Sequence, residues 1–391
     1  MKKKRFYTNL MILMGVILLP ACITPFTPNG LGTQGGTLAI EGDIILNGDS
    51  KIYLSLSKDL QSDDEITYVT SAQVWVESER GTQYAGVLQA DPNTQPYYLI
   101  HTNNLDVETS YKLCINLADG NLYESDFLTP YPTSEIESID YIVDDTKTVV
   151  DFFVTSYGNE NISRYYKWRF REDWEINSLY VSNYFYDPNT DMIVPFTTVP
   201  NMYYCWNQAE SSSILIAKTD HLDENTVYQQ KLNTIYYLND KISNLYSLEL
   251  TQMSISHEAY IYWSALKKNT DEIGGIFAPQ PNEMYGNIRC ITNPALKALG
   301  YISAGIVASK RIFLTSEDIG IYVSSRCPFF DPLEASPPPG LPLTVRQIYE
   351  LGYMVVKQDV YDSVNWAPIT CVDCRARGTK NKPLFWPNDH I

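Results

Sequence analysis

Alternation of apolar and polar residues with a period of two is the feature that most limits the folds open to this chain. It runs through Val74 and Val76 in the first part of the chain and through Tyr166, Trp168 and Phe170 in the second. Successive side chains of a β-strand point to opposite faces, so this pattern indicates strands that bury one face. Helical spacing interrupts it in two places. The sequence therefore predicts a mainly β protein.

A stretch with two prolines, residues 129–133, divides the chain into two β regions. Residues 37–130 carry short alternating segments at the spacing of an immunoglobulin-like β-sandwich, and Asp119 with Gly120 forms a strong hairpin signal. Residues 131–391 form a longer region that also alternates as strands do. We expect an N-terminal immunoglobulin-like β-sandwich, followed by a larger antiparallel β-rich domain with two short helices and a cysteine-containing C-terminal segment.

The two predicted helices both lie in the second region. The first begins near Ser256, where Ala259 and Tyr262 recur at the spacing of one helix face. The second begins at Thr344, which stands three residues before Gln347 as in a capping box. Both helices are expected to cover a sheet.

Residues 1–21 predict a bacterial lipoprotein signal peptide. Four bases within the first five residues precede an apolar run of ten that ends at Leu19. A membrane-spanning helix needs about 20 apolar residues, so the run is too short for a permanent span. Leu19, Ala21 and Cys22 resemble a lipobox, whose cysteine is acylated after cleavage before it. Cys22 is therefore the predicted lipidation site, and acyl chains at about 0.8 kcal/mol per buried CH₂ would hold the protein at a membrane.

The mature chain is expected to be strongly acidic and tethered. Residues 22–36 are rich in Pro, Gly and Thr, a composition typical of a flexible tether. The whole chain of 391 residues has a net charge of −17. Cleavage removes four bases and leaves 25 bases against 46 acids, a net charge of −21. A nucleic-acid partner is excluded, because phosphates would be repelled.

The cysteines favour structural disulfides. Six remain after Cys22, and an even number in an exported chain is typical of disulfide bonding, although six allow fifteen pairings. Cys114 lies on a polar strand face and is expected to stay unpaired. No pair of histidines stands at a spacing that would complete a zinc site, so no metal site is predicted. The candidate disulfide cysteines are Cys205, Cys290, Cys327, Cys371 and Cys374.

The residues show no convincing catalytic pattern. Ser303 lies between Gly300 and Gly305 in a segment like a nucleophile elbow, but the first glycine stands three residues before it instead of two. Asp187 and Asp191 belong to a segment with alternate oxygen ligands, which lacks the glycine and final glutamate of a calcium loop. We expect a hairpin turn there, no catalytic residue and no cofactor.

Aromatic clusters form the last candidate site. The chain has 30 Tyr against 13 Phe, and tyrosine and tryptophan are enriched at protein interfaces. Adjacent residues of a strand face opposite ways, so each cluster is expected to point at least one ring towards solvent or a partner. The candidate partner or ligand surface consists of Tyr184, Tyr186, Tyr204 and Trp206.

Several short motifs follow the lipobox along the mature chain. They are Ile40–Asp43, Ile255–Trp263, Gly286–Cys290, Leu299–Tyr301, Cys371–Arg375 and Lys382–Trp386. In this order they resemble the family of domain of unknown function 4249 (DUF4249), lipoproteins widespread in Bacteroidota. The resemblance implies an outer-membrane lipoprotein often encoded beside a TonB-dependent receptor, and it carries over no catalytic residue.

The sequence thus predicts a non-enzymatic, lipid-anchored outer-membrane protein. We expect it to accompany a TonB-dependent receptor in nutrient uptake or outer-membrane assembly. One alternative is a stand-alone module that binds glycan or peptide, and a second is a hydrolase. The ligand, the receptor and the membrane face stay open at this point.

Overall fold

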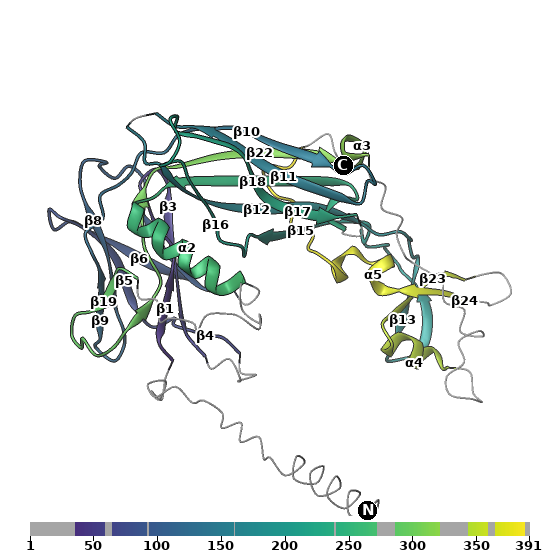
Figure 1. Cartoon of the computed structure of the whole chain (residues 1–391). Coiled ribbons are helices and arrows are strands. Elements are labelled where there is room, and N and C mark those ends of the chain that lie inside the picture. Colours follow the sequence, from purple (N-terminus) through teal and green to yellow (C-terminus); the bar gives the residue numbers. More distant parts are fainter. Residues whose placement is uncertain are drawn as a thin grey trace, which may run out of the picture.

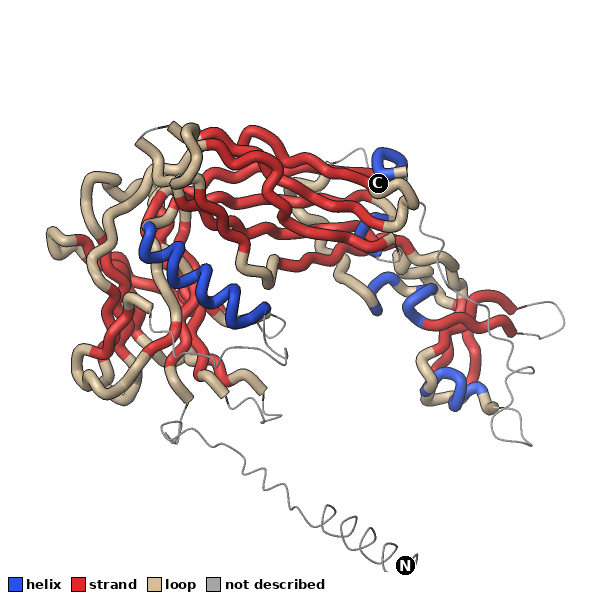
Figure 2. The backbone as a smooth tube through the Cα atoms, viewed as in Figure 1, coloured by secondary structure: helices blue, strands red, loops and turns tan. Residues whose placement is uncertain are grey.

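Strands dominate the structure, as the sequence predicts (Figure 2). The computed structural model describes residues 36–58, 65–91, 94–159, 161–237, 240–271, 286–320, 343–358 and 364–387. These residues form three β units arranged as an arch: a central slab of long strands, an N-terminal unit below one end and a small C-terminal unit below the other (Figure 1).

The N-terminal unit is a continuous sheet that curves into a sandwich. Ile52, Leu54, Val74 and Val76 alternate with more exposed neighbours and fill its core, each at most 3% exposed. The β-sandwich predicted here is therefore confirmed. In order of pairing, its strands are β19 (Ile288–Cys290), β9 (Leu122–Ser125), β8 (Tyr111–Asn116), β5 (Gln73–Ser78), β6 (Gln83–Gln89), β7 (Tyr97–His101), β3 (Asp49–Leu56), β1 (Leu38–Glu41) and β20 (Ala298–Leu299), with β4 (Thr67–Tyr68) on β3.

Residues 288–305 return to this unit from late in the chain. β20 pairs in parallel with β1, and β21 (Ala304–Gly305) pairs in parallel with β2 (Ile44–Ile45). Gly300 has a φ of 121°, and a Cβ there would lie 2.0 Å from the Ile40 carbonyl oxygen, so only glycine fits. The sequence assigned this segment to the second domain, because strands of two or three residues are too short to show their pairing partner.

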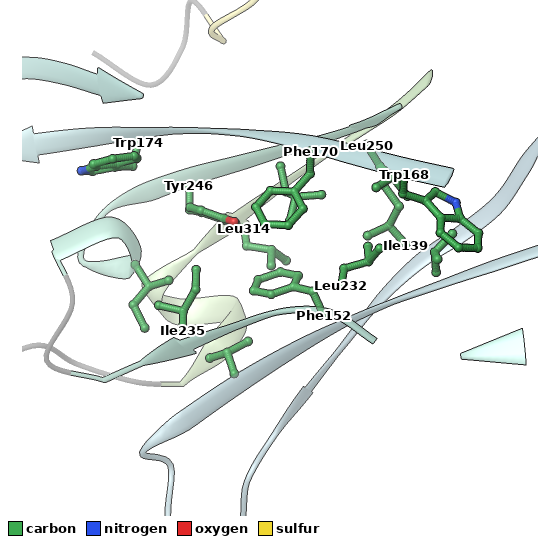
Figure 3. Packing of buried hydrophobic residues seen from close by; sticks show 14 of the residues in the cluster. Ile139, Phe152, Trp168, Phe170, Trp174, Leu232, Ile235, Tyr246, Leu250 and Leu314 are labelled. Atoms are coloured by element: carbon green, nitrogen blue, oxygen red, sulfur yellow. The ribbon is translucent and has the colours of Figure 1, made fainter. Parts of the chain in front are cut away.

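The central unit packs two sheets face to face. Its core joins Phe152 and Leu232 of the first sheet to Trp168, Tyr246 and Leu250 of the second (Figure 3). The first sheet contains β10 (Ile136–Val143), β11 (Val149–Tyr157) and β17 (Thr226–Tyr236). The second contains β15 (Tyr204–Glu210), β12 (Tyr165–Asn177), β18 (Leu245–Ser254) and β22 (Val307–Thr315), with β16 (Leu215–Lys218) on β12; a 3₁₀ turn, η1 (Asp240–Ile242), precedes β18.

The described residues contain four short α-helices where the sequence predicts two. α2 (His257–Asp271) begins where expected and buries Ala259 and Tyr262. α4 (Val345–Glu350) starts with the predicted capping box, in which Thr344 and Gln347 exchange side-chain and backbone hydrogen bonds. α3 (Ser316–Ile319) and α5 (Ile369–Val372) have only four residues each, too few for a helical period to appear in the sequence.

The small C-terminal unit joins two hairpins. β13 (Tyr184–Asp187) pairs with β14 (Met192–Pro195), which confirms the hairpin turn expected between Asp187 and Asp191. β23 (Tyr353–Gln358) pairs with β24 (Val364–Pro368), and Ile348, Val355 and Trp366 form the core. The chain then passes through η2 (Cys374–Ala376) and returns to the central unit, where Trp386 packs against Trp206.

A disulfide holds this returning segment. Cys205 of β15 is bonded to Cys374, 169 residues later, with a Cα–Cα distance of 5.5 Å. Cys371 is disulfide-bonded as well, so the neighbouring Cys371 and Cys374 do not pair with each other. Cys327 lies outside the described residues.

Two buried cysteines are free, Cys114 and Cys290. The prediction for Cys114 is confirmed, although the residue is fully buried beside Glu124; burial raises the pKa of its thiol to about 12. The prediction of a disulfide at Cys290 is wrong. Cys290 pairs with Tyr123, which in turn pairs with Ile115, so these three side chains lie on one face of the sheet. Cys114 precedes Ile115 and points to the opposite face, so the two thiols cannot meet.

The N-terminal predictions fall on residues that are not described. The signal peptide, Cys22 and the tether up to residue 35 lie outside the described ranges. Within those ranges, none of the helices has both the length and the apolar character needed to cross a bilayer.

Replacing Cys205 and Cys374 together by alanine should lower the free energy of unfolding by about 2–5 kcal/mol, because the disulfide closes a very long loop in the unfolded chain. Guanidinium unfolding followed by tryptophan fluorescence measures this loss. Cys114→Ala is the matched control, since it removes a buried cysteine that closes no loop. A double variant as stable as this control would contradict the prediction.

Candidate functional site

A cavity of about 550 Å³ lies where the N-terminal unit meets the central unit. Strands β1 and β3 form one wall. Strand β12, residues 211–215 and helix α2 form the other, so both units and the first helix are needed to build it. Its volume falls within the range of about 300–1,000 Å³ that is usual for small-molecule sites. This junction is the candidate functional site.

An ion pair closes the deep end of the cavity. The Lys167 ammonium donates to the Asp43 carboxylate at 2.6 Å, with both side chains less than 10% exposed. The second oxygen of Asp43 accepts from the Ser303 backbone N–H at 3.2 Å. Burial lowers the pKa of Lys167, and the neighbouring Asp43 opposes that effect. The pair links β12 to the loop after β1 and to the returning segment before β21.

Lys167 owes its position to the alternation of β12. Tyr166 and Trp168 point into the core of the central unit, so Lys167 between them points at the N-terminal unit. There its ammonium lies 4.9 Å from the centre of the Trp263 ring, a cation–π distance. The sequence shows Lys167 only as part of a polar strand face, and its partner Asp43 is 124 residues away.

The outer end of the cavity carries a second, more exposed ion pair. Arg169 lies 3.1 Å from Glu41, so it too spans the two units. Tyr53 stands beside this pair on β3. Burial, together with the nearby carboxylates of Glu210 and Glu41, raises the pKa of Tyr53 to about 12. The phenol therefore stays protonated and can both donate and accept a hydrogen bond.

The four predicted aromatic residues do not form one surface. Tyr186 is 5% exposed and donates to Asp191 at 2.5 Å, while Tyr184 packs into the core of the small unit. Trp206 is 8% exposed beneath Trp386, and Tyr204 is partly buried next to it. The prediction that Tyr186 and Trp206 form an open surface is therefore wrong, because segments more than 100 residues later in the chain cover them.

Other tyrosines are exposed instead. Tyr228 and Tyr236 of β17 are 70% and 65% exposed, and Tyr157 of β11 is 54% exposed. The residues next to Tyr228 and Tyr236, Val227 and Ile235, point into the central core, so these tyrosines lie on the outer side of the sheet. We call Tyr157, Tyr228 and Tyr236 the tyrosine face. For Tyr228 and Tyr236, the position beside an inward-pointing aliphatic residue is the sequence signal.

Ser303 is buried, and the Asp43 carboxylate beside it accepts from its backbone N–H and not from its hydroxyl. Its hydroxyl makes no hydrogen bond within the described part of the chain. It borders a separate hollow of about 230 Å³, whose lining does not include Tyr53. In the same described ranges, no three His, Cys, Asp or Glu side chains gather as a metal site.

The family comparison matches residues 23–311 to the model described as domain of unknown function DUF4249. The chain belongs to this family. The DUF4249 region ends within β22, so it contains both walls of the cavity, both ion pairs and the tyrosine face. No curated protein matches the chain. The family resemblance noted in the sequence is therefore confirmed.

The buried ion pair of the DUF4249 region gives a quantitative prediction. Lys167→Met should lower the free energy of unfolding by about 3–5 kcal/mol, because Asp43 is then left charged and buried. Asp43→Asn should cost a similar amount, and the double variant should cost clearly less than the sum. Urea unfolding of the four proteins in a double-mutant cycle measures the coupling.

The exposed pair Lys231 and Asp151, 2.7 Å apart on the central unit, supplies the control. The same substitutions there should cost less than about 1 kcal/mol, as surface pairs do. Additive effects of Lys167→Met and Asp43→Asn would show that the two charges do not support each other.

Proposed function

We propose that this DUF4249 protein is a non-enzymatic, lipid-anchored outer-membrane protein that accompanies a TonB-dependent receptor in nutrient uptake or outer-membrane assembly. The tyrosine face is the observation that carries the proposal. Three tyrosines, each more than half exposed, lie on strands β11 and β17. Exposed aromatic rings in this number are typical of surfaces that bind another protein.

The charges around the tyrosine face also suit a protein partner. Lys231 and Asp151 lie between its rings on the same two strands and neutralise each other at 2.7 Å. The mature chain has a net charge of −21, so most of its surface repels an anionic membrane. A locally neutral aromatic face within an acidic surface favours contact with protein over contact with lipid.

The predicted anchor keeps this face within reach of a membrane receptor. Fifteen residues, 23–37, separate Cys22 from the first strand and span at most about 54 Å when fully extended. A partner in the same membrane is then held at high effective concentration, so a modest interface suffices for stable association.

The position of Ser303 favours the non-enzymatic proposal over the hydrolase alternative. A serine nucleophile needs a base within hydrogen-bond reach, and the Ser303 hydroxyl has no partner within the described ranges. The cavity between the units gives the second alternative, a solute-binding role, its own support. The two roles are compatible, because the cavity and the tyrosine face lie on different strands.

Cys22→Ala should release the protein from the membrane fraction, because it removes the thiol that is acylated. Labelling cells with an alkyne fatty acid and fractionating them measures both the loss of label and the loss of membrane association. Cys290→Ala serves as a control, since that thiol is buried in the folded unit. Membrane association that survives Cys22→Ala would contradict the lipid anchor.

Replacing Tyr228 and Tyr236 together by alanine should reduce receptor recovery at least about tenfold. The reason is that two aromatic anchors at the centre of an interface are each worth about 1–2 kcal/mol or more. Affinity purification in mild detergent with mass spectrometry measures recovery of a TonB-dependent β-barrel receptor. Ile66→Ala with Val107→Ala removes exposed apolar side chains from the N-terminal unit and should leave recovery unchanged. Recovery of the wild-type protein with no receptor would refute the proposed partnership.

A further inference from the structure

We propose that the cavity between the N-terminal and central units binds an uncharged, hydroxyl-rich solute of the size of a short saccharide. This deepens the solute-uptake role proposed above by naming a ligand class. The site is independent of the tyrosine face. Its walls come from two units, an arrangement typical of small-molecule sites.

The charges of the cavity oppose a charged ligand at both ends. At the deep end, the Lys167 ammonium lies over the Trp263 ring and would repel a cation. Asp43 already neutralises this ammonium, so it does not attract an anion. At the outer end, the carboxylates of Glu41 and Glu210 near Tyr53 would repel an anion. The positive charge of Arg169 is already paired with Glu41. A charged group that broke the Lys167–Asp43 pair would leave a buried charge without a partner, which is costly where water is excluded. An uncharged ligand avoids that cost.

The cavity offers neutral hydrogen-bonding groups. Besides the protonated hydroxyl of Tyr53, its lining includes Ser55, Gln95 and Ser213. The indole N–H of Trp263 is buried and has no hydrogen-bond partner within the described residues. These groups match a solute that carries many hydroxyls.

Apolar groups alternate with these polar ones. Ile40, Leu266 and Leu299 line the cavity together with the rings of Tyr53 and Trp263. A sugar ring presents C–H groups on its faces and hydroxyls at its edge, so it needs both kinds of surface. A fatty acid would leave the hydroxyls and amides unpaired, and its carboxylate would meet the acidic outer end.

Isothermal titration of the purified full chain in detergent tests the ligand class. The probes are neutral disaccharides and trisaccharides (maltose, cellobiose, N,N′-diacetylchitobiose and maltotriose), with an anionic and a cationic counterpart, 3′-sialyllactose and chitobiose. We expect saturable binding of at least one neutral probe, and binding of the charged probes at least about tenfold weaker. Absence of saturable binding by every neutral probe, or equal binding of a charged one, would overturn the proposal.

Single substitutions test whether the saccharide binds in the cavity. Ser213→Trp adds bulk at an exposed position of the lining and should abolish binding without disturbing a core. Ser71→Trp, at an exposed position outside the lining, is its matched control. Tyr53→Phe should weaken binding about two- to tenfold, the effect of one hydrogen bond. Unchanged binding in Ser213→Trp at an unchanged melting temperature would overturn the site.

The saccharide proposal and the receptor proposal can be tested separately. Ser213→Trp should still recover the receptor in the purification described above, because the tyrosine face is intact. Failure to bind saccharides with intact receptor recovery would refute the ligand class alone.

Discussion

The buried contact between Lys167 and Asp43 determines how the N-terminal unit sits on the central unit. It joins Lys167, near the start of β12, the longest described strand, to Asp43 in the turn after β1, and the second oxygen of Asp43 holds the returning segment through Ser303. Removing both charges from water costs nearly as much as their attraction returns. The pair therefore disfavours those arrangements of the two units in which one of the two charges stays buried without the other.

The cavity is a consequence of that arrangement. The units touch at the Lys167–Asp43 pair and at the hydrogen bonds between Asn47 and Val307 of β22, while α2 covers one side. Between these contacts lies the cavity of about 550 Å³. Because Arg169 and Glu41 form a second cross-unit pair at the outer end, the charges of the lining are matched within the protein itself. What is left for a ligand is neutral: hydroxyls, amides and rings.

Whether an aromatic residue of this protein lies on the surface or in the interior depends on segments that are distant in the sequence. Tyr186 and Trp206 are covered by α4 and by the C-terminal segment around Trp386, which arrive from far along the chain. Tyr228 and Tyr236 belong to a sheet whose outer side is covered by no described segment, so their rings meet solvent. The same residue type in the same kind of strand thus serves packing in one place and a candidate interface in another.

The sequence by itself determined what depends on neighbours along the chain. Period-two alternation predicted the strands, Thr344 and Gln347 predicted a helix start, and the position of Cys114 on a polar strand face predicted that it stays unpaired. Only the tertiary structure decided the pairing of β1 with β20, the partners of Cys205 and Lys167, and which aromatic rings are covered. The physical reason is that alternation reveals which face of a strand is buried but carries no information about the segment that buries it.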